Sequence, residues 1–169
     1  MEFNHIPVLL DQCLDGLSIR PDGIYVDGTA GGAGHSSAIV AKLGVNGRLI
    51  ALDRDPDAVA VASERLSRFP NARVIHRNYS EMRAVLDELG VELVDGILMD
   101  LGVSSFQLDE GSRGFSYHTD APLDMRMSKE GMSAADLVNT YSENEIARIL
   151  FEYGEEKFSR RIASNIVRI

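Results

Sequence analysis

The chain has 169 residues, of which 44% are hydrophobic and 25% charged, and its formal net charge is −9. Such a length predicts about one domain with a sizeable core, and the composition excludes a disordered linker. No apolar run reaches the roughly 20 residues of a membrane span, and the single cysteine, Cys13, excludes an internal disulfide. The N-terminus resembles no signal peptide and the four histidines lack metal-ligand spacing, so we expect a cytoplasmic protein without membrane contact or structural metal.

The first hundred residues alternate short apolar runs with amphipathic stretches, which predicts strand–helix units around a parallel sheet. Strands are expected at 24–27, 48–53, 72–76 and 94–100. The helices expected between them run from His35 to Leu43 with a stop at Gly44, from Asp55-Pro56 to about Arg68, and from a Ser80 cap to about Glu88 with a stop near Gly90. The predicted fold is an α/β, doubly wound parallel sheet.

The region after residue 100 has a different texture. Residues 101–132 hold many turn formers and no sustained period, which is typical of a functional loop. Capping boxes at Ser133 and Ser142 predict two helices, Gly154 ends the second, and a further helix is expected from Glu155 onward. Because the fourth strand is an apolar edge and the last helix lacks a cap, we expect the N-terminal part of a longer protein.

A glycine-rich stretch, Asp27-Gly-Thr-Ala-Gly-Gly-Ala-Gly-His35, lies between the first strand and the next helix. Glycines there let the backbone turn sharply and approach a ligand closely. Asp53 ends the second strand, where a carboxylate can accept hydrogen bonds from the hydroxyls of an adenosine ribose. Loop and carboxylate together predict a nucleoside-bearing cofactor; the alternative is a tight turn followed by an exposed Asp.

The identity of that cofactor depends on charge. The dinucleotide pattern GxGxxG is not met, because Ser37 stands where the third glycine belongs. A carboxylate at Asp27 favours a ligand with a cationic amino-acid group and disfavours a pyrophosphate. This favours S-adenosyl-L-methionine over NADP, for which Arg54 would be the 2′-phosphate partner.

Asp100 ends the fourth strand and is followed by the polar turn Ser104-Ser105. Ligands of open parallel sheets bind outside the carboxyl ends of the strands, so Asp100 is expected to face the same crevice as Asp53. By accepting a hydrogen bond from a ring-conjugated amine, Asp100 with Ser104 would make that amine a better nucleophile. The alternative is that Asp100 caps the following turn.

Other residues have two interpretations each. Tyr79 is placed to pack on an adenine ring or in the core, and Arg113 to hold RNA or to anchor its loop. After Glu156 the chain is basic at Lys157, Arg160, Arg161 and Arg168, although the net charge argues against nucleic acid. This basic stretch begins either an RNA surface or a solvated helix face.

Taken together, these segments resemble the bacterial small-subunit ribosomal RNA cytosine-N4 methyltransferases of the MraW type. The matching stretches are His5–Leu10, Asp27–His35, Asp53–Pro56, Asp100–Ser105 with Gln107, Arg113–Phe115 and Pro122–Met127. The resemblance implies a Rossmann-like methyltransferase fold that uses S-adenosyl-L-methionine to methylate the exocyclic amine of a cytosine in ribosomal RNA of the small subunit.

The resemblance also assigns roles to individual positions. It implies cofactor contacts at Ala33, Gly34, His35, Asp53, Tyr79, Asp100 and Gln107. Asp100 and Ser104 are the catalytic candidates from the position of the fourth strand end. It divides the chain into 1–105, the N-terminal part of the methyltransferase domain, 106–132, a substrate loop, and 133–169, the start of a helical insertion. Two other hypotheses remain: an NAD(P)-dependent oxidoreductase, and a non-catalytic nucleotide-binding module.

Overall fold

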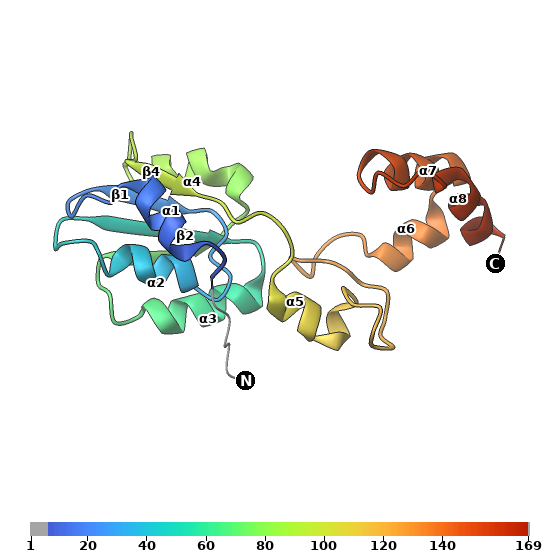
Figure 1. Ribbon diagram of the computed structural model, residues 1–169, viewed down its shortest axis with the longest axis horizontal. Helices are drawn as coiled ribbons and strands as arrows, with labels where there is room; N and C mark the ends of the chain where they lie inside the picture. Colours follow the sequence, from blue (N-terminus) through green and yellow to red (C-terminus); the bar gives the residue numbers. More distant parts are fainter. Residues whose placement is uncertain (1–6, 169) are drawn as a thin grey trace. The chain divides into compact units, whose positions relative to one another are not determined.

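The structure is a computed structural model that describes residues 7–168 (Figure 1). The chain divides into two compact units, Met1–Ser105 and Phe106–Ile169, and each is described by itself. His5, which carries part of the resemblance, lies outside the described residues. Within residues 7–168, no helix is long and apolar enough to cross a membrane.

The first unit is built on four parallel strands in the order β3-β2-β1-β4. The strands are β1 (Ile24–Asp27), β2 (Arg48–Asp53), β3 (Ala72–His76) and β4 (Gly96–Leu98). The predicted bounds of the first three are confirmed, whereas β4 is shorter than the predicted 94–100. Before β4, the carboxylate of Asp95 accepts from Ile24 N at 2.7 Å, and the strand ladder with β1 begins at the next residue. At the other end, the ladder stops after Leu98.

Helices cover both faces of this sheet (Figure 1). Tyr25, Leu49 and Ala51 point to the face covered by α1 (Leu10–Leu17), α2 (Gly34–Val40) and α3 (Pro56–Leu66). Val26 and Ile50, one residue on in each strand, point to the face covered by α4 (Met82–Glu88). This alternation follows from the two-residue period of a strand, and each fully buried aliphatic side chain contributes about 1.5–3 kcal/mol. The doubly wound α/β prediction is confirmed.

The helix predictions hold in part. Asp55 caps α3 by accepting from Asp57 N at 3.0 Å, with proline in the first turn, as predicted. Gly44 does not end α2: the helix stops at Val40, and Gly44 N donates to Pro21 O at 2.8 Å instead. The helix α1 was not predicted.

The predicted Ser80 cap is also wrong. A 3₁₀ turn, η1 (Tyr79–Glu81), precedes α4, and its cap is Asn78, whose side chain accepts from Ser80 N. Glu81 completes the capping box by accepting from Asn78 N. Gly90 follows α4 with a φ of 66°, in agreement with the predicted stop.

The second unit begins one residue into α5 (Ser105–Asp109) and continues with the 3₁₀ turn η2 (Gly111–Arg113), α6 (Ala134–Thr140), α7 (Glu143–Glu152) and α8 (Ser159–Val167). Both predicted capping boxes form, at Ser133 and Ser142. Ile146, Ala147 and Ala163 make a small core between α7 and α8. The last helix begins four residues later than predicted, at Ser159.

The loop between η2 and α6 is held by Arg113. Its buried guanidinium donates to the carbonyl oxygens of Arg126 and Met127, both at 2.9 Å. Asp124 pairs with Arg126 at 2.7 Å, and hydrogen bonds from that guanidinium lower the pKa of Asp124 to about 2. Of the two interpretations of Arg113, the structure shows the loop anchor.

Candidate functional site

The carboxyl end of the sheet in the first unit brings several predicted site residues together. From β1, the chain crosses to β2 on one side and β4 lies on the other. Open parallel sheets bind ligands at such a switch point, just beyond the strand ends. The glycine loop after β1, Asp53 at the end of β2 and Asp100 after β4 all lie at this edge.

Asp53 is half-buried and holds the glycine loop in place. Its Oδ2 accepts from Gly31 N at 2.8 Å, and its Oδ1 accepts from Asp55 N at 2.9 Å. Gly31 has a φ of 49°, a left-handed conformation that glycine adopts without strain. An ionised carboxylate has about four acceptor positions, so Asp53 keeps capacity for two further hydrogen bonds.

Asp27 lies inside the unit, at 1% exposure. Its carboxylate accepts from the hydroxyl of Ser36 at 2.6 Å and from Thr29 N at 3.1 Å. Burial raises the pKa of Asp27, and the bonds from Ser36 and Thr29 act in the opposite direction. The oxygens of Asp27 therefore stabilise the loop from within, and the preference of this carboxylate for a cationic ligand over a pyrophosphate stays a prediction.

Asp100 is connected to the same loop through its backbone. Asp100 N donates to Thr29 Oγ1 at 2.7 Å, and Gly28 N donates to Leu98 O at 2.9 Å. The Asp100 carboxylate is exposed and makes no hydrogen bond or ion pair within residues 7–168. It does not cap the following turn, so it is available to a ligand.

Tyr79 lies beside the loop. A Cβ added to Gly28 would be 3.3 Å from Tyr79 Cβ and 3.1 Å from Met99 Cγ, so glycine permits this close approach. Tyr79 is 41% exposed, which excludes the core interpretation. The structure thus gathers the loop, Asp53, Tyr79 and Asp100 in one unit.

The three loop residues assigned to the cofactor are closely packed against their neighbours. Ala33 is fully buried with a φ of 61°, and His35 Nε2 is 3.1 Å from Val8 O. A Cβ at Gly34 would lie 2.4 Å from Pro7 Cγ, so this position requires glycine. Any ligand contact from these residues must come from their backbone atoms.

The remaining two candidates are placed less directly. Ser104 is half-buried in the first unit. Gln107 belongs to α5 of the second unit, where it is buried. Their predicted roles stay predictions.

Two residues that organise the loop were missed from the sequence. Arg65 of α3 donates from Nη1 to Gly32 O at 2.6 Å, and Thr29 accepts from Asp100 N. A hydroxyl residue inside a glycine-rich loop is a signal that could have identified Thr29. No local signal marks Arg65, because its partner lies 33 positions away.

The comparison with protein families shows where the chain belongs. A model of the MraW methylase family matches residues 2–169. The chain belongs to this family. Membership of this family does not favour the NAD(P)-dependent oxidoreductase, the hypothesis in which Arg54 would bind a 2′-phosphate. Arg54 is exposed.

Two curated relatives of this MraW-family chain share a name. It is 56% identical over 169 residues to "Ribosomal RNA small subunit methyltransferase H" of Lachnospira eligens, and 55% identical over 168 residues to the protein of that name from Clostridium botulinum. Each alignment covers 99% of this chain and 54% of the relative. The chain therefore spans about half the length of the curated relatives it matches.

Among solved structures, a SAM-dependent methyltransferase from Aquifex aeolicus is similar at a TM-score of 0.42 and 20% identity, over 86% of this chain and 79% of that one. A putative rRNA methylase from Clostridium thermocellum is similar at a TM-score of 0.43 and 21% identity, over 47% of this chain and 48% of that one.

Within residues 7–168, no group of three or more His, Cys, Asp or Glu side chains is arranged to hold a metal ion.

Proposed function

We propose that this chain is the N-terminal part of an enzyme that methylates the exocyclic N4 amine of a cytosine in small-subunit ribosomal RNA, with S-adenosyl-L-methionine as methyl donor. The observation that carries the proposal is the edge where the glycine loop, Asp53 and the unpaired carboxylate of Asp100 meet. Family membership and the name of the curated relatives support it. Its compartment is the cytoplasm, where bacterial ribosomal RNA resides.

The residues present fit this cofactor. Asp53 has acceptor capacity left for the two ribose hydroxyls after its bonds to Gly31 N and Asp55 N. The exposed Tyr79 can pack on the adenine ring. The backbone atoms of Ala33, Gly34 and His35 form the part of the loop that would contact the cofactor. Gln107, which the resemblance assigns to the cofactor, lies in the second unit, and its role stays a prediction.

The bound cofactor supplies an electrophilic methyl group on a sulfonium. The chain's own residues act on the amine. The carboxylate of Asp100 accepts a hydrogen bond from the N4–H, localises the nitrogen lone pair, and takes the proton that the amine loses. Ser104 orients the cytosine ring beside the carboxylate of Asp100. A positioned general base of this kind contributes about 10²–10⁴-fold in rate.

The cofactor assignment is tested by Asp53→Asn and Asp53→Ala. We expect the dissociation constant for S-adenosyl-L-methionine, measured by equilibrium dialysis, to rise more than tenfold, because ribose acceptors are lost. Arg54→Ala, the exposed neighbour, is the control and should bind normally. Unchanged affinity of both Asp53 variants, with intact circular dichroism, would remove the ribose assignment.

The catalytic assignment is tested by Asp100→Ala in the complete protein. Transfer of a labelled methyl group to small-subunit RNA should fall by about 10²–10⁴-fold while the fold survives. Nucleoside mass spectrometry identifies the product as N4-methylcytidine or another methylated base. Full turnover by Asp100→Ala ends the role of this carboxylate, and another product corrects the substrate atom.

A further inference from the structure

A histidine at the end of β3 lies at the carboxyl edge of the sheet and has no role in the proposed chemistry. His76 is the register partner of Asp53 in the parallel pairing of β2 and β3. Val74 points to the face of the sheet that α3 covers, and Ile75 points to the other face. The two-residue period of a strand therefore returns the His76 ring to the α3 face, beside the turn that leads from Asp53 into α3.

The end of β3 binds that turn by its backbone. His76 Nε2 is 3.0 Å from the carbonyl oxygen of Arg54. Because a carbonyl oxygen only accepts, Nε2 carries a proton and donates it to this hydrogen bond. The preceding carbonyl oxygen, Asp53 O, accepts from Arg77 N at 3.0 Å. Two consecutive carbonyl groups of the turn are thus held from β3.

The carbonyl of Arg54 and the N–H of Asp55 belong to the same peptide group. A trans peptide is planar, so its C=O and its N–H point in opposite directions. The carbonyl accepts from His76, and the N–H donates to Asp53 Oδ1 at 2.9 Å. A hydrogen bond that fixes the carbonyl therefore also fixes the N–H, and with it the orientation of the Asp53 carboxylate.

We propose that His76 is a positioning residue for the cofactor. Through the Arg54–Asp55 peptide it holds the Asp53 carboxylate in the orientation that receives the ribose hydroxyls of S-adenosyl-L-methionine. The inference rests on the proposed function, which assigns the ribose to Asp53. A carboxylate that is oriented before the ligand arrives raises affinity, because the cost of ordering it is not incurred on binding.

The first test measures the binding of S-adenosyl-L-methionine to the complete protein by equilibrium dialysis. His76→Leu removes the donor and should raise the dissociation constant about three- to tenfold, as expected when one hydrogen bond between neutral groups is lost. His76→Gln keeps an N–H donor on a side chain of similar reach, and should bind within about twofold of the wild type.

A double-variant cycle separates an effect on Asp53 from a general loosening of the sheet edge. In an Asp53→Ala background the carboxylate is absent, so adding His76→Leu should change the dissociation constant by less than about twofold, because residues that act through one group are not additive. In steady-state methyl transfer, His76→Leu should raise KM for S-adenosyl-L-methionine and keep kcat within about twofold, since ground-state and transition-state binding are lost equally.

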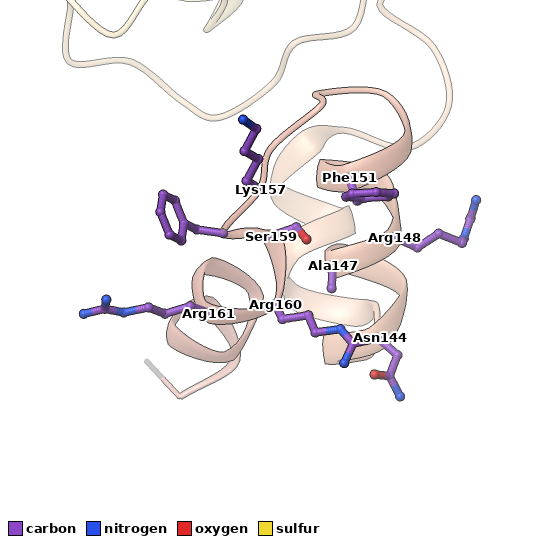
Figure 2. Close-up of a pocket in the computed structure, with 9 residues that line it drawn as sticks. Asn144, Ala147, Arg148, Phe151, Lys157, Ser159, Arg160 and Arg161 are labelled. Atoms are coloured by element: carbon purple, nitrogen blue, oxygen red, sulfur yellow. The ribbon is translucent and has the colours of Figure 1, made fainter.

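Two controls replace exposed polar side chains elsewhere. Arg73→Leu lies on the same strand. Asn144→Leu lies in the second unit, on the wall of an open hollow between α7 and α8 (Figure 2). Both should bind S-adenosyl-L-methionine within about twofold of the wild type, as expected of surface substitutions.

Four results would each overturn the inference. They are wild-type affinity in His76→Leu, equally weak binding in His76→Gln and His76→Leu, losses from His76→Leu and Asp53→Ala that multiply, and a loss in Arg73→Leu as large as that in His76→Leu. All four concern His76 alone and are measured against a wild-type protein that binds the cofactor. A wild-type protein that binds no S-adenosyl-L-methionine contradicts the proposed function, and this inference with it.

Discussion

Ser36→Ala tests how the glycine loop is held from within the first unit. The Ser36 side chain is fully buried, and its hydroxyl donates to Asp27 Oδ2 at 2.6 Å. The substitution leaves a buried carboxylate with Thr29 N as its remaining donor. A hydrogen bond to a charged group contributes about 1.5–3 kcal/mol, against roughly 0.5–1.5 kcal/mol for a neutral one.

The expected loss therefore depends on the ionisation of Asp27. Because burial raises its pKa and the bond from Ser36 lowers it, the alanine variant raises that pKa further. We expect a loss of about 2 kcal/mol once Asp27 is ionised, and a smaller loss at acid pH. For a unit of about a hundred residues this lowers Tm by roughly 8–16 °C.

Urea unfolding followed by circular dichroism measures the effect across pH. Ser37→Ala, one residue on in α2, is the matched control, because Ser37 is half-buried and its side chain makes no hydrogen bond to any residue of 7–168; it should change stability by less than about 0.5 kcal/mol. A Ser36→Ala loss no larger than that of the control, or one that shrinks as the pH rises, would refute this account of the loop.

Asp27→Asn should remove the part of the pH dependence of folding stability that comes from Asp27. The raised folded-state pKa means that the stability from Asp27 is fully present below its ordinary value of 3.8 and is lost as the pH rises through the folded pKa. The amide variant should lack this decline in urea unfolding, and an unchanged decline contradicts the assignment. In the second unit, Gly114 has a φ of 70°, and a Cβ there would lie 2.3 Å from Pro122 O, so Gly114→Ala should destabilise that unit by more than about 2 kcal/mol. Gly131→Ala has a similar φ and open space, and should cost about 1 kcal/mol. Equal losses of stability in the two variants, measured by amide hydrogen exchange of the second unit, would disprove the steric argument.

Much of the first unit was predictable because its signals are local. Strand bounds follow from apolar runs bounded by turn residues, and the Asp55-Pro56 start of α3 follows from capping chemistry within two residues. Ser133 and Ser142 were identified as caps for the same reason. One prediction failed because two local options competed: Asn78 and Ser80 could both cap, and the capping box with Glu81 favoured Asn78.

The candidate site shows the same division. The sequence alone determined that a glycine loop and carboxylates at the ends of β2 and β4 would meet at one edge, because parallel strands end together. Only the tertiary structure decided that Asp27 turns inward to Ser36 while the Asp100 carboxylate stays unpaired. The position of a residue in the sequence shows which strand end it follows. Whether that side chain faces the interior or a ligand depends on burial and on partners that other elements supply, as Arg65 does for Gly32.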